Sequence, residues 1–165
     1  MREILRYYLE IRDLKDLKKV NAPNKDVAFQ LVKKPDFNLN KFFYKQIGKK
    51  HRWIDRLSWN DQIWSNYITN NSVKTYILKE GQELAGYFEQ IHNKDNNEHE
   101  IAYFGILEEY RNKRYGAYLL SKAIELSLID DSKRVWVHTC TLDHKNAIKN
   151  YLSRGMKIFK EEKIK

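Results

Sequence analysis

The sequence predicts one mixed α/β domain. Stretches in which apolar and polar residues alternate, as in strands, are separated by stretches in which apolar residues recur every three or four positions, as in helices. Residues 101–107 are almost entirely apolar on both faces, which is typical of a strand buried on both sides of a sheet. With 165 residues, 42% of them hydrophobic, the chain is long enough to bury a core of its own. Neither a repeat nor a linker interrupts it, so residues 1–165 are expected to form a single domain.

Two strands and two helices are expected in the variable N-terminal part, residues 1–70. Alternation predicts strands at Ile4–Ile11 and Val27–Val32. Residues 37–67 are helical in pattern and rich in aromatic side chains, and Ser58 is the expected N-cap of the second helix. Three of the four tryptophans lie in this segment: Trp53, Trp59 and Trp64. Each is expected either to bury a helix face or to line an acceptor site.

Strands and helices are expected to alternate in the second part of the chain. Val73–Lys79 and Glu83–Ile91 are predicted to form a hairpin around Gly81. The next strand is expected to place Ile101, Tyr103, Gly105 and Leu107 on one face and Ala102, Phe104 and Ile106 on the other.

A further strand and helix are predicted near the C-terminal end. Arg134–Thr141 has the pattern of a strand. The helix after it is expected to have Thr141 or Asp143 as its cap and to run to Arg154. Gly155 fits the C′ position of this helix, before a last strand that begins at Met156.

A basic loop, residues 111–116, follows the doubly buried strand and precedes a helix. A helix N-terminus offers unpaired backbone N–H groups and a partial positive charge, and Arg111, Lys113 and Arg114 stand beside this one. Gly116 leaves room for the backbone to approach a phosphate oxygen. The loop is therefore either a phosphate-binding site or a basic, solvated helix start.

This loop resembles a known cofactor motif. Arg111-x-x-Arg114-x-Gly116-Ala117 after a buried strand is similar to the acetyl-CoA pyrophosphate loop of the GCN5-related N-acetyltransferases (GNAT), whose usual pattern is Gln or Arg, two residues, Gly, one residue, and Gly or Ala. Arg114 stands where the family usually has its first glycine. Its side chain either adds a charge to the phosphates, which we favour, or obstructs them.

A second segment, residues 146–156, resembles the family's other cofactor motif. Ala147, Tyr151 and Gly155 follow one another at intervals of four residues before an apolar strand. Two motifs in the family's order are more specific than either alone. The resemblance covers roughly residues 73–159, which are expected to form the acetyl-CoA-binding core.

The resemblance implies a GNAT-like fold, in which helices flank a central, mostly antiparallel sheet. The sheet is expected to be splayed between the fourth and fifth core strands, here the strand at 98–107 and the next one at 134–141. The pantetheine arm of acetyl-CoA would lie in that gap, and an N–H near Leu107 would polarise the thioester. The implied cofactor-binding residues are Phe104, Ile106, Leu107, Arg111, Asn112, Lys113, Arg114, Tyr115, Gly116, Ala117, Asn146 and Tyr151.

The implied chemistry is acyl transfer from a thioester to an amine. A general base must take the proton of the amine. Glu100 is the first choice because its distance from Gly116 matches the catalytic glutamate of the superfamily's histone-modifying members, while His138 and Glu89 are the reserves. Tyr151 occupies the position of the tyrosine that often protonates the departing thiolate in this family. Each of these residues also has a purely structural interpretation, as a surface glutamate or a packing tyrosine.

The charge balance raises an alternative partner. Thirty-one Lys and Arg against 22 Asp and Glu give a net charge of +9, which suits a polyanion such as nucleic acid. The basic residues are scattered in pairs and do not form a stripe, which argues against nucleic acid as the main partner.

Other features point to a cytoplasmic enzyme without a metal. No stretch approaches the ~20 apolar residues of a membrane span, and no secretion signal is recognisable, so no membrane partner is expected. The single cysteine, Cys140, excludes an internal disulfide. His138, Cys140 and His144 lack a fourth ligand, so no metal is expected. Cys140 as an acyl carrier, with His138 as its base, is a less favoured route.

Three hypotheses remain open from the sequence. The leading one is an acetyl-CoA-dependent N-acetyltransferase that acts by direct attack on a primary amine of a small molecule or peptide. The others are a non-catalytic module that binds coenzyme A and a basic nucleic-acid-associated protein. The acceptor and the choice between monomer and homodimer are left open.

Overall fold

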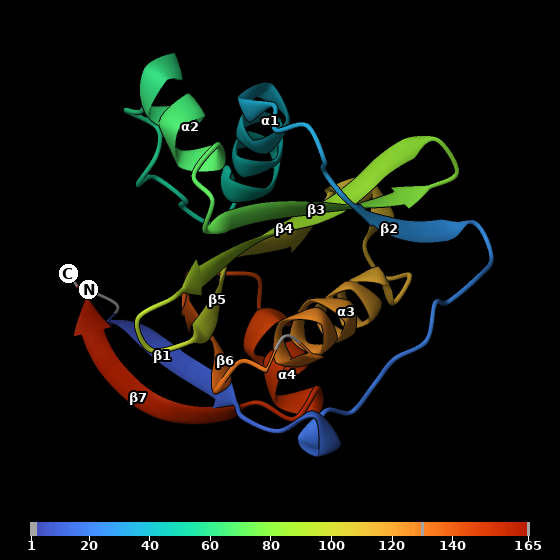
Figure 1. Cartoon of the computed structure of the whole chain (residues 1–165), viewed down its shortest axis with the longest axis vertical. Helices are drawn as coiled ribbons and strands as arrows, with labels where there is room; N and C mark the ends of the chain where they lie inside the picture. Colours follow the sequence, from blue (N-terminus) through green and yellow to red (C-terminus); the bar gives the residue numbers. More distant parts are fainter. Residues whose placement is uncertain (1–2, 130, 165) are drawn as a thin grey trace.

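The computed structural model describes residues 3–129 and 131–164 and has one mixed α/β domain, as predicted (Figure 1). The strands are β1 Ile4–Ile11, β2 Val27–Leu31, β3 Val73–Glu80, β4 Glu83–Asn93, β5 Glu98–Ile106, β6 Arg134–Cys140 and β7 Lys157–Ile164. The helices are α1 Phe37–Gly48, α2 Asp61–Ile68, α3 Tyr115–Ile129 and α4 Ala147–Ser153, with 3-10 turns at Leu14–Asp16 and Glu108–Tyr110. Among the described residues, no helix combines the length and the apolar character that crossing a membrane requires.

All of these strands belong to one sheet, in the order β2-β3-β4-β5-β6-β1-β7. Every neighbouring pair is antiparallel except β5 and β6, which run parallel. In Figure 1, α1 and α2 cover one face of the sheet and α3 and α4 cover the other. The central strands are therefore buried on both sides.

Each face of the sheet has its own hydrophobic core. Leu120 of α3 and Phe88 of β4 belong to the cluster on the α3 face, and both are completely buried. On the other face, Phe43 and Ile47 of α1 pack with Tyr87, and the rings of Phe43 and Tyr87 stack with their centroids 4.6 Å apart. Burying each large apolar side chain contributes roughly 1.5–3 kcal/mol, so both helical layers are held firmly on the sheet.

The predicted splay lies between β5 and β6. The two strands pair only near their starts, where Glu98–Glu100 lies beside Arg134–Trp136. Beyond these residues no pairing joins the two strands in the described part of the chain, although β5 continues to Ile106 and β6 to Cys140. The divergence exposes the backbone edge of each strand to the space between them.

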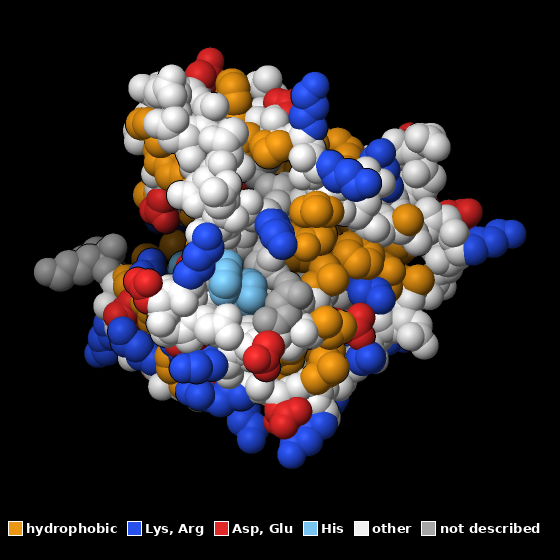
Figure 2. Space-filling view, in the orientation of Figure 1, with side chains coloured by type: hydrophobic (Ala, Val, Ile, Leu, Met, Phe, Trp, Pro, Cys, Tyr) orange, Lys and Arg blue, Asp and Glu red, His pale blue; other side chains and the backbone are white. Residues whose placement is uncertain are grey.

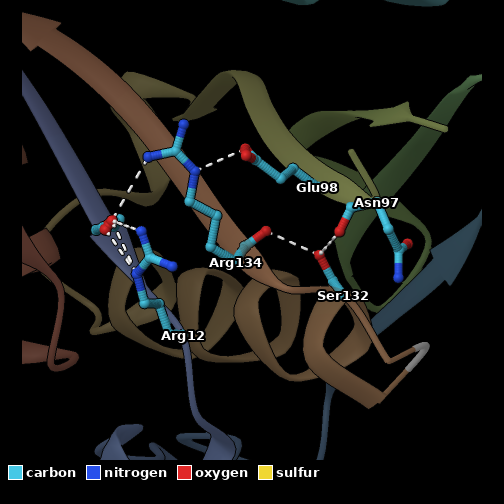
Figure 3. A network of polar contacts seen from close by, with 6 residues as sticks. Arg12, Asn97, Glu98, Ser132 and Arg134 are labelled. Atoms are coloured by element: carbon cyan, nitrogen blue, oxygen red, sulfur yellow. Dashed lines mark hydrogen bonds and ion pairs between the residues drawn. The ribbon is translucent and has the colours of Figure 1, made fainter. Parts of the chain in front are cut away.

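Side-chain contacts stabilise the closed end of the splay, where β5 and β6 are still paired (Figure 3). Arg134 donates from Nε to Glu98 Oε2 at 2.6 Å and from Nη1 to Glu10 Oε1 at 3.5 Å. The hydroxyl of Ser132 donates to the carbonyl oxygens of Asn97 at 3.3 Å and Arg134 at 2.8 Å. Because these contacts join β5, β6 and β1 at one end, the strands are free to diverge only at the other end.

A bulge in β5 changes one predicted face. Gln90 pairs with Ile101 and Glu89 with Tyr103, so Ala102 is an extra residue in the ladder. Ile101 consequently belongs to the core on the α3 face, whereas Tyr103 packs with the core under α1. The expectation that Ile101 and Tyr103 share a face was wrong, because a strict two-residue alternation does not include the extra residue.

Two predicted helix caps were also wrong. The N-cap of α2 is Asn60, not Ser58, and Asn60 Oδ1 accepts from the amide of Ile63 at 2.9 Å. The last helix begins later than predicted, at Ala147, so neither Thr141 nor Asp143 caps it. Asn60 and Ser58 are both good capping residues, and only the path of the chain into the helix selects between them.

Candidate active site

A cavity of about 680 Å³ opens where β5 and β6 diverge. Its walls come from the second half of β5, from residues 110–117, from the end of β6 with the loop after it, and from residues 51–55 between α1 and α2. Figure 2 shows histidine side chains, with Lys and Arg side chains around them, near the centre of one face of the molecule. The cavity therefore combines an apolar strand surface with basic groups.

The N-terminus of α3 forms one end of this cavity. The first intrahelical bond runs from the amide of Tyr118 to the oxygen of Arg114, at 3.2 Å. The amides at 115–117 precede it, so they have no partner within the helix. Tyr115, Gly116 and Ala117 all line the cavity. Unpaired N–H groups and the positive end of a helix dipole are features that favour an anion.

The loop before α3 explains the family's preference for glycine. Asn112 and Arg114 have positive φ angles of 65° and 68°. A left-handed conformation costs a residue other than glycine roughly 1–2 kcal/mol. Arg114 therefore adopts the backbone geometry for which the family usually has glycine, and its exposed side chain lines the mouth of the cavity.

Gly116 has no such backbone requirement. A Cβ at this position would lie 3.7 Å from Asn150 Nδ2 and 3.7 Å from Ile106, which are ordinary contacts. The fold itself therefore tolerates a side chain here. Asn150 donates to the carbonyl oxygen of Gly116 at 3.2 Å and thereby joins α4 to the first turn of α3.

The exposed edge of β5 consists of the backbone at Phe104 and Ile106. The amide of Leu107 donates to the oxygen of Ala85 in β4 at 2.8 Å, so Leu107 faces β4. Successive residues of a strand direct their polar groups to opposite sides. Phe104 and Ile106 therefore present N–H and C=O groups to the gap. Because the amide of Leu107 is already hydrogen-bonded, the N–H near Leu107 that remains available to the gap is that of Ile106.

Most of the remaining predicted cofactor residues also meet here. The cavity is lined by Phe104, Ile106, Arg111, Asn112, Arg114, Tyr115, Gly116, Ala117, Asn146 and Tyr151. Lys113 does not line it, because its ammonium pairs with Glu80 at 3.3 Å and lies 5.4 Å from the centroid of the Tyr110 ring.

Tyr151 lies at the bottom of the site. Its side chain is 6% exposed, lines the cavity and meets Phe104 edge-to-face with ring centroids 6.4 Å apart. Burial, and to a smaller extent the charge of Asp143, raises the pKa of the Tyr151 phenol well above its usual range. The phenol therefore carries its proton at neutral pH and has a proton to donate.

Of the three candidate bases, only His138 lines the cavity. Burial and the charge of Arg6 lower the pKa of His138, so the imidazole is neutral near pH 7. Glu100 lies at the closed end of the splay, beside Trp136, and burial raises the pKa of its carboxyl group. A neutral imidazole that lines the gap is able to accept a proton there.

Glu89 lies elsewhere, in the core under α1 and α2. It is 0% exposed, and its carboxylate forms an ion pair with Arg56 at 3.0 Å. Asn40 and Tyr67 also donate to it, at 2.9 and 2.6 Å. The guanidinium of Arg56 is itself surrounded by five aromatic rings, those of Tyr44, Trp59, Trp64, Tyr67 and Tyr103. Glu89 therefore does not line the cavity, and both oxygens of its carboxylate already have partners.

Residues 51–55 complete the cavity, and of these only Trp53 was considered from the sequence as a possible wall of an acceptor site. The indole of Trp53 donates to Asp143 Oδ1 at 3.1 Å, and His51 meets His144 edge-to-face at 5.7 Å. These contacts join the α1–α2 connection to the loop after β6. In the sequence, only the aromatic composition of this segment indicated that it could line the site. Of the three tryptophans there, Trp53 lines the cavity and Trp64 is buried in the core.

In the part of the chain that the structure describes, no three His, Cys, Asp or Glu side chains are grouped so as to hold a metal ion. His138 and Cys140 line the cavity from β6, and burial raises the pKa of the Cys140 thiol. A thiol with a raised pKa is a poor nucleophile at neutral pH.

The fold is thus an α/β domain whose sheet is splayed between β5 and β6, with the N-terminus of α3 at the gap. The model of the acetyltransferase (GNAT) family matches residues 38–156, and the chain therefore belongs to this family. No curated protein matches the sequence closely enough to narrow this further.

Solved structures share the fold at low sequence identity. A GCN5-related N-acetyltransferase from Sphaerobacter thermophilus aligns with 99% of this chain and 51% of its own, at 11% identity and a TM-score of 0.73. One from Kribbella flavida aligns with 94% of this chain and 56% of its own, at 13% identity and a TM-score of 0.66. The chain thus spans just over half the length of each.

A third neighbour is similar in length. Spermidine N-acetyltransferase from Vibrio cholerae, in complex with CoA and spermine, aligns with 80% of this chain and 81% of its own. The identity is 16% and the TM-score 0.64. At such identities these neighbours establish a common fold.

Proposed function

We propose that the protein is an acetyl-CoA-dependent N-acetyltransferase that acts by direct attack on a primary amine of a small molecule or peptide. The observation that carries this proposal is that the unpaired edge of β5 and the open N-terminus of α3 line one cavity. Membership of the acetyltransferase family supports it. When bound, acetyl-CoA supplies an acetyl group activated as a thioester.

The chain's own groups fit such a ligand from end to end. The amides at 115–117, with Arg111 and Arg114, would hold the pyrophosphate. Phe104 and Ile106 offer backbone donors and acceptors for the amide groups of the pantetheine arm. The N–H of Ile106 would stabilise negative charge on the thioester oxygen, because the strand holds this donor in a fixed position that is partly shielded from water.

Proton transfer is assigned to two side chains of the cavity. We place the general base at His138, ahead of Glu100, because His138 lines the cavity and its lowered pKa keeps the imidazole neutral. His138 would accept the proton of the attacking amine. Tyr151 would donate its proton to the leaving sulfur, for which its buried, protonated phenol is suited. Glu89 has no part in this scheme.

The acceptor would enter beside residues 51–55. Asp55 is exposed and lines the cavity together with Trp53 and Tyr103. A carboxylate and two aromatic faces favour an ammonium group. The spermine bound to the Vibrio cholerae neighbour supports an amine acceptor of this kind.

Calorimetric titration with acetyl-CoA tests the proposal, with ATP as the control nucleotide. Saturable binding of acetyl-CoA is expected, together with release of free thiol when primary amines are added. Binding without thiol release from any amine would favour the non-catalytic module. Absence of binding would contradict the proposal, and salt-dependent binding to nucleic acid would then be tested.

Gly116 offers a specific variant for this titration. Gly116→Val is expected to abolish acetyl-CoA binding, because branched methyl groups would occupy the space at the N-terminus of α3, and Gly116→Ala to weaken it. Gly116→Ala should melt close to the parent, since the structure leaves room for a Cβ there. Unaltered affinity in Gly116→Val would show that the phosphate loop has been misplaced.

A further inference from the structure

Arg6 of β1 is a cationic side chain of the cavity that the proposed reaction does not use. Its Nε atom is buried and has no hydrogen-bond partner among the residues that the structure describes. Its Nη1 atom reaches Glu162 of β7 at 3.4 Å, which is long for a hydrogen bond between charged groups. The side chain is 32% exposed, so part of the guanidinium is accessible. Turning this guanidinium toward a ligand would therefore cost one weak contact and no hydrogen bond from Nε.

The carboxylate of Glu162 is shared among several groups. Its Oε1 atom accepts from the hydroxyl of Tyr8 at 2.6 Å, a shorter hydrogen bond than the one from Arg6. Its Oε2 atom lies 3.8 Å from the ammonium of Lys160. One carboxylate thus faces two cations, and the excess positive charge beside Arg6 favours an anionic group.

Arg6 and the proposed base, His138, lie on the same face of the sheet. In the ladder between β1 and β6, Arg6 is opposite Cys140 and Tyr8 is opposite His138. Residues two apart in a strand share a face, so Arg6 and His138 are diagonal neighbours, roughly 7–8 Å apart. The ring of Tyr8 contacts the imidazole of His138 with centroids 5.7 Å apart. Since Arg6 and His138 both line the cavity, one ligand can contact both.

This spacing suits a ligand that carries an amine and a carboxylate on one carbon atom. In an α-amino acid the nitrogen and the nearer carboxylate oxygen are about 3 Å apart. A hydrogen bond at each end adds about 3 Å, so the amine can reach His138 while the carboxylate reaches Arg6. A guanidinium binds a carboxylate through two parallel hydrogen bonds. The carboxylate of Asp55, in the same cavity, would attract the amine of the ligand as it enters.

We propose that Arg6 binds a carboxylate of the acceptor and that the acceptor is therefore an α-amino acid, whose primary amine is presented to His138. The inference rests on the proposed function, because it assumes that acetyl transfer takes place in this cavity. Ile4 and Ile164 are paired where β1 begins and β7 ends, and both line the cavity. These two side chains favour an amino acid with an apolar side chain.

The transfer step balances with the groups already assigned. The neutral amine nitrogen forms a bond to the acetyl carbon, and the bond from that carbon to sulfur breaks. One proton passes from the nitrogen to His138, and one passes from Tyr151 to the sulfur. Solvent then returns a proton from His138 to Tyr151. The products are an N-acetylated amino acid and coenzyme A, and Arg6 keeps its charge throughout.

The test compares amino acids with analogues that lack the carboxylate, by thiol release from acetyl-CoA with the full chain. L-leucine is measured beside L-leucinamide and 3-methylbutylamine, which keep its amine and its side chain. The amine pKa values of these analogues are about 8 and about 10.4, on either side of that of leucine, so amine basicity cannot explain a preference for leucine over both. We expect kcat/KM for leucine to exceed both values roughly 10–100-fold, as a charge-assisted pair allows. The other L-amino acids, each beside its amide, extend the comparison to every side chain.

Arg6→Gln should reduce the ratio of kcat/KM for the preferred amino acid to that for its amide about tenfold. Arg6→Lys keeps the charge but not the two parallel donors, so its ratio should lie between those of the parent and Arg6→Gln. Both substrates use the same base and the same fold, so an effect of the substitution on His138 or on stability cancels in the ratio. This ratio therefore separates recognition of the carboxylate from a purely structural role of Arg6.

Arg12→Gln is the matched control. Arg12 follows the end of β1, its side chain is 67% exposed, and it pairs with Glu10. It lies roughly 20 Å along the strand from Arg6, beyond the screening length of physiological salt, so its ratio should equal that of the parent. Thiol release that is no faster with any amino acid than with its amide, or an unchanged ratio in Arg6→Gln, would overturn the assignment and leave the proposed function intact. Absence of thiol release with every amine would overturn both.

Discussion

Replacing Glu89 by glutamine gives the most direct test of the core on the α1 face. The substitution preserves the shape of the side chain and removes its charge. Arg56, which is 6% exposed, would then keep a buried positive charge without its partner at 3.0 Å. Breaking a buried pair in this way typically costs 3–5 kcal/mol. For a domain of this size each kcal/mol shifts Tm by about 2–4 °C, so we expect a decrease of roughly 6–20 °C.

Urea unfolding monitored by tryptophan fluorescence measures this free energy directly. The double variant Arg56→Met/Glu89→Gln removes both charges and is expected to recover a large part of the stability, because no uncompensated charge remains. Glu161→Gln is the matched control, since Glu161 is exposed and forms no ion pair in the described chain. It should change the stability by no more than about 0.5 kcal/mol.

The result that would refute this reasoning is specific. A Glu89→Gln protein with the stability of the parent but without thiol release would place Glu89 in the chemistry and not in the core. Equal destabilisation in the single and double variants would show that the aromatic rings around Arg56, rather than the ion pair, dominate the energetics.

Three further predictions concern the site and its frame. Tyr151→Phe should lower the rate of thiol release roughly 10²-fold with little change in acetyl-CoA affinity, and an unchanged rate would remove Tyr151 from the mechanism. Gly155→Ala should be far more destabilising than Gly81→Ala in thermal melts, because both have positive φ but only at Gly155 would a Cβ collide with a backbone oxygen, at 2.2 Å; equal effects would contradict this. Burial and a nearby guanidinium lower the pKa of His51 and of His144, so the folded state binds fewer protons than the unfolded state. The contribution of these two histidines to stability should therefore be complete above about pH 6.5 and fall as the pH decreases. Replacing both by glutamine should reduce this dependence in melts across that range, and the part due to His138 should remain.

The phosphate loop and the order of elements were predictable from the sequence because they are local. Alternation marks β3 and β4, and a glycine turn joins them. The spacing of Arg111, Gly116 and Tyr151 identified the family, and all three residues line the cavity. Gly155 was recognisable as a C′ residue, and its φ angle of 106° agrees.

The remaining features depend on contacts between distant parts of the chain. The pairing of Arg56 with Glu89 and the hydrogen bond from Trp53 to Asp143 span dozens of residues, and no periodicity reports them. The bulge at Ala102 depends on how β5 is paired with β4.

The sequence by itself determined the class of fold, the family and the strand-loop-helix unit for which we propose phosphate binding. The tertiary structure alone decided which of the three candidate bases faces the cavity: His138 lines it, whereas Glu89 is closed within an ion pair and Glu100 lies at the closed end of the splay. The physical reason is that local preferences of the backbone follow from neighbouring residues. Exposure, charge pairing and the environment that shifts a pKa arise only when separate segments pack together.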